Sequence, residues 1–320
     1  MVSAWEDVLK YKTGFLIVLI CLIVFCSCSA DISSRGKVHV VIVALDYANS
    51  AIGALSGTTD DALEMGQCLT SIYASRGIDC TVHYMVQQGT DIPAQSSTYP
   101  TASNIIDMID SIETTDRDML VFYYSGHGEV DNDVFSIHEA SMITAKPTEG
   151  SLELTTLTFT DLAEALERKK GSKVALIDCC YAGNLRKDRP SYAKSFTQSL
   201  QDLMQEASFN EIAVLCSSGA DELSVTSRYF SDGISEAHGL FTMSVLKALG
   251  WNHSDSVYTP VSIEGKMLFA YGYLADVPSS LTVRELASNV EENWRAPVST
   301  EQHPCTNVTV MDYLIIPEVN

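Results

Sequence analysis

Short apolar runs rich in β-branched residues alternate with helical patterns along most of this chain. Residues 38–45 (VHVVIVAL) form the first such run, and residues 60–74 then carry apolar side chains at helical spacing. Further strands are expected at 81–86, 119–124, 173–178, 211–216 and within 308–316, and further helices at 102–112, 162–169, 240–249 and 281–293. Near-continuous apolar strands separated by helices indicate a parallel sheet covered on both faces. We therefore predict an α/β fold, with loops at 131–152 and 184–192.

The charge of the chain excludes some partners. Its 320 residues include 41 Asp and Glu against 20 Lys and Arg, a formal net charge of −21. A surface this acidic does not suit nucleic acid or attachment to anionic lipid through a basic patch. Two interpretations stay open: the charge keeps the protein soluble, or it also favours basic substrates.

The N-terminal segment predicts export. An apolar run at 14–25 follows Lys10 and Lys12, and small residues come after it, which is the layout of a secretory signal peptide. Residues 1–30 could equally be a lipoprotein signal acylated at Cys28, or a retained signal anchor. We expect a secreted, periplasmic or membrane-anchored protein, in contact with membrane only through this segment.

The nine cysteines do not form a disulfide framework. No CxxC pair occurs, and no Cys/His group has zinc-finger spacing, so no metal site is expected. One disulfide, between Cys68 and Cys80, is left open.

Two predicted strands end in segments that carry chemistry. Residues 124–128 read YSGHG and residues 177–183 read IDCCYAG. Because sites in open α/β sheets gather beyond the carboxyl ends of the strands, we expect His127 to lie near the cysteine pair. A thiolate activated by an imidazole is a nucleophile for acyl transfer. The alternatives are a surface histidine and two buried structural thiols.

Together these segments resemble the caspase/metacaspase superfamily of clan CD cysteine peptidases, and bacterial metacaspase-like (orthocaspase) proteins most closely. His127 precedes Cys180 by 53 residues, near the spacing of about 50 in caspases. The segments 55–62 (LSGTTDDA), 215–224 (LCSSGADELS) and 238–242 (HGLFT) are also similar to that superfamily, and the resemblance extends over residues 37–315. It implies a caspase-like three-layer α/β/α sandwich with a mostly parallel central sheet of about six strands.

The resemblance also implies catalytic roles. Cys180 would be the nucleophile and His127 the general base and acid, with Cys179 as the second candidate nucleophile. The backbone N–H groups of Gly128 and Cys180 would stabilise the oxyanion.

The same resemblance implies a preference for basic residues. Asp61, Ser125 and Asp178 match the positions that bind the substrate residue before the scissile bond. Two carboxylates suit a guanidinium or ammonium group, so we expect protein or peptide substrates cleaved after Arg or Lys. Capping of a helix N-terminus is the alternative role for Asp61.

We expect one catalytic domain with a large part at 37–185, a linker at 186–208 and a small part at 209–317. Arg186 and Lys187 in the linker are candidate self-cleavage sites. The alternatives to a peptidase of this specificity are a catalytically silent caspase-like interaction module and a clan CD peptidase that cleaves after another residue.

No cofactor is expected to be required. Asp131, Asn132 and Asp133 follow the histidine motif. They offer fewer oxygen ligands than the six or so that calcium takes, so calcium binding is possible but unsupported.

Overall fold

The structure, a computed structural model, describes most of the chain from residue 36 onward. The described residues are 36–48, 50–89, 96–130, 140–148, 151–181, 212–217, 238–293, 305–306 and 313–318. The described helices and strands lie in one compact unit that begins at Lys37. Within these ranges no helix has the length and apolar character needed to cross a bilayer. The predicted N-terminal export segment, including Cys28, lies outside the described residues.

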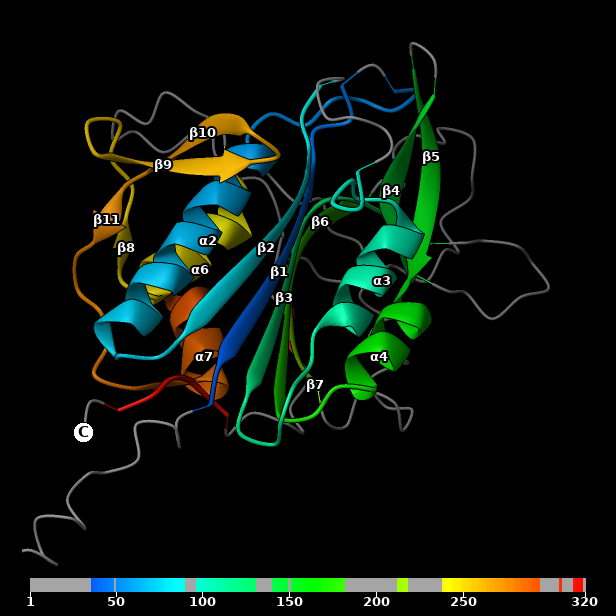
Figure 1. Ribbon diagram of the computed structural model, residues 1–320. Helices are drawn as coiled ribbons and strands as arrows, with labels where there is room; N and C mark the ends of the chain where they lie inside the picture. Colours follow the sequence, from blue (N-terminus) through cyan, green and yellow to red (C-terminus); the bar gives the residue numbers. More distant parts are fainter. Residues whose placement is uncertain are drawn as a thin grey trace, which may run out of the picture. The chain divides into compact units, whose positions relative to one another are not determined.

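A twisted, mostly parallel sheet forms the centre of this unit (Figure 1). Its strands follow the spatial order β13, β7, β6, β3, β1, β2. Their bounds are β13 (Cys305–Thr306), β7 (Ile212–Cys216), β6 (Ser172–Tyr181), β3 (Met119–Val130), β1 (Val38–Leu45) and β2 (Cys80–Gln87). All neighbours in this order are parallel except β13, which pairs antiparallel with β7. The predicted parallel sheet of about six strands is confirmed.

β3 and β6 both continue for several residues beyond the apolar runs that predict them. They stay in register as far as Gly128 opposite Tyr181, and Gly128 also pairs with Met142 of β4. These pairings keep the backbone extended. The two motifs with chemistry therefore lie inside neighbouring strands and not in loops after them.

A β-hairpin occupies much of the segment predicted as a loop at 131–152, so that prediction is wrong over its second half. β4 (Ala140–Thr148) pairs antiparallel with the end of β3 and with β5 (Ser151–Thr158). Polar threonines weaken the apolar signal of these strands, yet Thr144 and Thr155 face each other and their hydroxyls hydrogen bond at 2.6 Å. Such cross-strand pairs stabilise sheets without apolar side chains.

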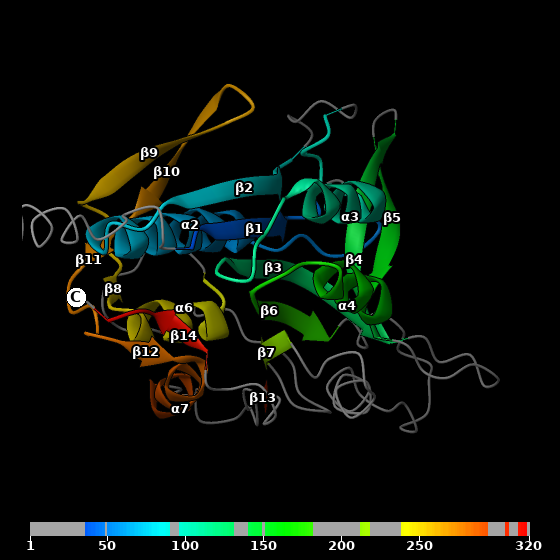
Figure 2. The same cartoon turned by 60° about the horizontal axis from the view of Figure 1, so that its bottom comes forward.

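Helices cover both faces of the sheet, which confirms the three-layer sandwich (Figures 1 and 2). The described helices are α2 (Thr58–Ser75), α3 (Ala102–Ser111), α4 (Phe159–Glu167), α6 (Leu240–Ala248) and α7 (Val283–Asn293). α3 and α4 lie on one face, and α2, α6 and α7 lie on the other. Side-chain caps begin three of them: Thr101 accepts a hydrogen bond from the Asn104 amide, Thr158 from the Asp161 amide and Thr282 from the Glu285 amide.

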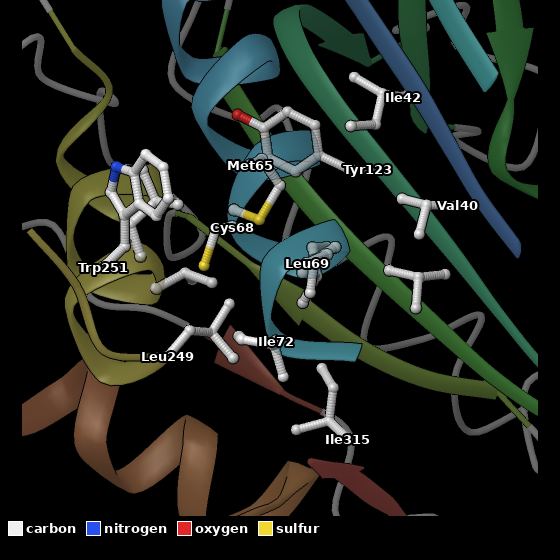
Figure 3. Close-up of a cluster of buried hydrophobic side chains, with 14 of the residues drawn as sticks. Val40, Ile42, Met65, Cys68, Leu69, Ile72, Tyr123, Leu249, Trp251 and Ile315 are labelled. Carbon is white, nitrogen blue, oxygen red and sulfur yellow. The ribbon is translucent and has the colours of Figure 1, made fainter. Parts of the chain in front are cut away.

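The sheet divides the apolar core into two clusters. One lies under α3 and α4 and includes Phe122 of β3 and Leu166 of α4. The other lies under α2 and α6, and Figure 3 shows Leu69 and Ile72 of α2 within it, with Ile72 between Leu249 and Ile315. Alternate residues of each strand point to opposite clusters, as expected for a sheet buried on both faces.

Short strands complete the face that carries α2. These are β8 (Trp251–Asn252), β9 (Tyr258–Ile263), β10 (Lys266–Tyr271), β11 (Tyr273–Leu274), β12 (Leu281–Thr282) and β14 (Leu314–Ile316). β14 falls within the last predicted strand but pairs with β12 and not with the central sheet. Cys68 and Cys80 are free thiols, so the disulfide left open by the sequence is not formed.

Candidate active site

Two neighbouring strands bring the predicted catalytic motifs together. β3 and β6 run parallel, with Ser125 opposite Asp178 and His127 opposite Cys180. Adjacent strands lie about 4.8 Å apart, so the two motifs meet although the sequence separates them widely. The side chain of Cys180 lies outside the described part, and its place in the site is therefore its register position on β6.

His127 is held in one tautomer. Its Nε2 lies 2.9 Å from the carbonyl oxygen of Gly53. A carbonyl only accepts, so Nε2 carries the proton and Nδ1 is left with a lone pair in the neutral ring. Nδ1 is buried and has no hydrogen-bond partner among the described residues. Burial lowers the pKa of His127 and the Gly53 bond opposes this only in part, which keeps the ring neutral near pH 7.

Two tyrosines fix the backbone around His127. The amide N–H of His127 donates to the hydroxyl of Tyr47 at 2.9 Å, and the hydroxyl of Tyr124 donates to the carbonyl of His127 at 2.7 Å. The two hydroxyls lie 2.8 Å apart, and the Tyr47 ring packs against the imidazole with centroids 4.7 Å apart. The imidazole is thus held in place by contacts from β1's carboxyl end and from β3 itself.

Cys179 points to the face of the sheet opposite to that of Asp178. It is 2% exposed and packs in the cluster under α3 and α4. Its backbone N–H donates to the hydroxyl of Ser217 at 3.2 Å. Because residues alternate along a strand, position 180 has the parity of Asp178 and not that of Cys179.

The two predicted substrate-binding acids converge on one glycine. Asp61 lies in the first turn of α2 and Asp178 on β6, and both are buried. A Cβ atom on Gly239 would contact the carboxylate of Asp178 and would lie 3.2 Å from Asp61 Oδ2. Ser125, the third predicted residue, is buried and opposite Asp178. The structure therefore brings the three predicted substrate-binding residues together.

Both acids are hydrogen bonded by the segment around α6. His238 Nδ1 lies 2.8 Å from Asp61 Oδ1, and the Gly239 amide donates to Asp61 Oδ2 at 2.9 Å. The amide and hydroxyl of Thr242 donate to Asp178 Oδ2 at 3.1 and 2.6 Å. Burial raises the pKa of Asp61, and the bond and charge of His238 act against this. Burial lowers the pKa of His238, but Asp61 and Glu64 outweigh it and raise that pKa to about 9. Asp61, Asp178 and His238, together called the acidic corner, therefore place several charged groups in a buried region.

A sequence model of the caspase domain matches residues 37–310. The chain belongs to the caspase-domain family. Membership indicates a cysteine peptidase of clan CD that acts on protein substrates. The chain is also similar to a crystal structure of a Geobacter sulfurreducens protein, at 15% identity and a TM-score of 0.46, over 85% of this chain and 92% of that one. A search of curated proteins finds no match.

For several residues at the site of this caspase domain, the sequence analysis predicts no role. Tyr47 follows β1's carboxyl end, the same kind of position that pointed to His127, and this signal could have found it. Glu64 lies one turn after Asp61 on α2, and both are buried acids within an otherwise apolar helix face. His238 and Thr242 act through hydrogen bonds that only the fold reveals.

Gly128, which is predicted with Cys180 to bind the oxyanion, directly follows His127 in β3. It is buried and lies opposite Tyr181 at the end of the β3–β6 register. The candidate self-cleavage residues Arg186 and Lys187 and the acidic segment at 131–133 lie outside the described residues.

Proposed function

We propose that this caspase domain is an exported cysteine endopeptidase that cleaves after Arg or Lys, with Cys180 as nucleophile and His127 as general base and acid. The observation that carries the proposal concerns His127, which pairs with Cys180 across β3 and β6. Its Nδ1 is buried and has no hydrogen-bond partner in the described part of the chain. The hydrogen bond from Nε2 to the Gly53 carbonyl orients the ring, and Nδ1 is left to accept a proton. A nucleophile is commonly activated by a base that a third group orients in this way.

The chemistry follows from this orientation. Nδ1 accepts the thiol proton of Cys180, and the thiolate attacks the carbonyl carbon of the scissile bond. The backbone N–H groups of Gly128 and Cys180 stabilise the oxyanion. His127 then gives the proton to the leaving amine, which leaves a thioester. A water molecule, deprotonated by His127, hydrolyses the thioester and restores the thiol.

The choice of Cys180 over Cys179 is supported by the packing of Cys179. A nucleophile must reach the substrate, whereas Cys179 is enclosed in the apolar cluster under α3 and α4. Buried thiols in such surroundings are inert.

The preference for Arg or Lys is supported by the convergence of Asp61 and Asp178 on Gly239. Two carboxylates would bind a cationic side chain and would repel an aspartate. His238 offsets part of this charge, since it forms an ion pair with Asp61 at 2.8 Å. We therefore assign the larger share of cation binding to Asp178, with Ser125 as a neighbouring acceptor.

Three further parts of the proposal concern the whole chain. Residues 1–30 direct export, as a signal peptide, lipoprotein signal or anchor. The large part at 37–185 and the small part at 209–317 form one domain that self-cleaves at Arg186 or Lys187 in the linker at 186–208. Catalysis needs no cofactor, and assays with and without calcium test this.

A fluorogenic peptide panel with Arg, Lys, Asp or Asn before the cleaved bond tests the proposal. We expect cleavage after Arg and Lys only, a loss of about 1,000-fold or more in Cys180→Ala, and near wild-type activity in Cys179→Ala. Asp178→Asn, which keeps an acceptor for Thr242, should raise KM for the Arg and Lys peptides by about tenfold or more.

Three other results of these assays would each contradict one part of the proposal. Inactivity on all peptides would favour an interaction module, and cleavage after Asn would favour another clan CD specificity. Activity that survives Cys180→Ala but is lost in Cys179→Ala would reverse the nucleophile assignment.

A further inference from the structure

Three buried side chains behind the acidic pair form a cluster that the proposed reaction does not use. Glu64 comes from α2, His238 directly precedes α6, and His253 follows β8. One nitrogen or oxygen from each lies within 4.8 Å of the others. The side chains of Glu64 and His238 are 0% exposed and that of His253 is 4% exposed.

His238 points its Nε2 into this cluster. Its Nδ1 bonds to the carboxylate of Asp61 at 2.8 Å, which places a proton on Nδ1. Its Nε2 is buried and has no hydrogen-bond partner among the described residues. Glu64 Oε1 lies 3.8 Å from this nitrogen, which is too far for a hydrogen bond. A buried polar atom without a partner calls for an occupant of the gap.

The other two side chains are oriented toward the same gap. The indole N–H of Trp251 donates to Glu64 Oε2 at 3.0 Å, which leaves Oε1 facing the two imidazoles. His253 Nδ1 lies 2.7 Å from Glu64 Oε1, and its Nε2 lies 3.1 Å from the carboxylate of Asp255. The two rings stand edge to face with centroids 4.9 Å apart.

We propose that Glu64 Oε1, His238 Nε2 and His253 Nδ1 bind a divalent transition metal of the zinc class. A metal ion bound there would displace the proton that His238 Nε2 carries in the charged ring. Each histidine has its second ring nitrogen on a carboxylate, Asp61 or Asp255, which is the arrangement that orients metal-binding histidines. Two imidazoles and one carboxylate suit zinc, with water as the fourth ligand. Calcium is disfavoured because it takes oxygen ligands.

Two separations between the ligand atoms bracket the value expected around a tetrahedral ion. Ligand atoms about 2.1 Å from zinc are roughly 3.4 Å from one another. The separations from Glu64 Oε1 to the two histidines, 2.7 and 3.8 Å, lie on either side of this value. Small rotations of the side chains would equalise them.

The site would join α2, the start of α6 and the end of β8. It would also fix Asp61 through His238, so metal binding would stabilise the acidic corner. The inference does not rest on the proposed peptidase activity, because binding and unfolding report on it directly.

The test uses the full chain carrying Cys180→Ala, so that the predicted Cys180–His127 pair does not bind the ion. After chelator treatment, calorimetric titration with Zn²⁺ should give one ion per chain, and Zn²⁺ should raise the Tm. Co²⁺ should give visible absorption typical of tetrahedral coordination without a thiolate charge-transfer band.

His253→Ala should weaken Zn²⁺ binding at least 100-fold, and His253→Gln provides a second variant that keeps a polar side chain. His83→Ala is the matched control, since His83 is a half-buried histidine of β2 outside the cluster, and it should leave binding unchanged. Circular dichroism confirms folding of each variant. Absence of Zn²⁺ binding, binding unaffected by both His253 variants, or a thiolate band with Co²⁺ would each overturn the proposal.

Discussion

At the scale of single residues, the tautomer of His127 connects local structure to chemistry. The Gly53 carbonyl fixes the proton on Nε2, and the Tyr47 and Tyr124 hydroxyls fix the backbone. In the proposed role of base, His127 would need no reorientation before it accepts a proton. Preorganisation of this kind lowers the barrier, because the geometry is set before substrate binds.

The buried position of His127 predicts the pH dependence of cleavage. Burial lowers its pKa from 6.5, so the neutral, basic form persists to lower pH than in an exposed histidine. The acid limb of kcat/KM against pH should therefore have its midpoint below pH 6.5, with activity rising as pH increases through it. A midpoint clearly above pH 6.5 would contradict the assignment of a neutral His127 as base.

The residues of the candidate site were predictable to different degrees. His127 and Asp178 lie on strands whose apolar runs show where the motifs begin. The expectation that the carboxyl ends of parallel strands share one edge was therefore enough to predict that these residues lie close together. Tyr47 and His238 act through single hydrogen bonds to partners far away in sequence. No local pattern records such bonds, and they follow only from the packed fold.

At the scale of elements, Gly126 allows the tyrosine hydroxyls to approach β3. A Cβ at this position would lie 2.5 Å from the Tyr47 hydroxyl and 2.6 Å from the Tyr124 hydroxyl. The glycine beside His127 therefore serves packing between β3 and the loop after β1, in addition to any approach by substrate.

Gly126→Ala should displace both hydroxyls and with them the backbone of His127. We expect a loss of about 1–3 kcal/mol in the free energy of unfolding, measured with denaturant, and a fall in kcat of about tenfold or more. Wild-type stability together with wild-type kcat would show that the tyrosines do not position His127.

The elements that the sequence predicted best are those with strong apolar periodicity. β1 has the predicted bounds, and α2, α3 and α6 differ from prediction by two residues or fewer at each end. β4 and β5 were missed because threonines and a proline replace apolar residues, and their pairing with the end of β3 compensates. Tertiary pairing outweighs local propensity there.

At the scale of the whole molecule, the predicted large and small parts share one sheet. β7 pairs with β6 from Lys173 opposite Ile212 to Ile177 opposite Cys216. α6 of the small part also supplies Thr242 to Asp178 of the large part. Neither part can complete the acidic corner alone.

Cleavage of the linker should therefore leave the two parts together. A specific protease site inserted between Lys187 and Asp188 allows complete cutting of purified protein. We expect two bands on a denaturing gel, one peak in size-exclusion chromatography and retained peptidase activity. Separation of the fragments without denaturant would contradict the shared sheet.

Covalent labelling tests whether Cys180 is a nucleophile activated by His127. A peptide electrophile ending in Arg should modify Cys180 alone, as located by mass spectrometry of the digested protein, and His127→Ala should slow this labelling about 100-fold or more. An adduct on Cys179, or equal labelling rates in wild type and His127→Ala, would contradict the account.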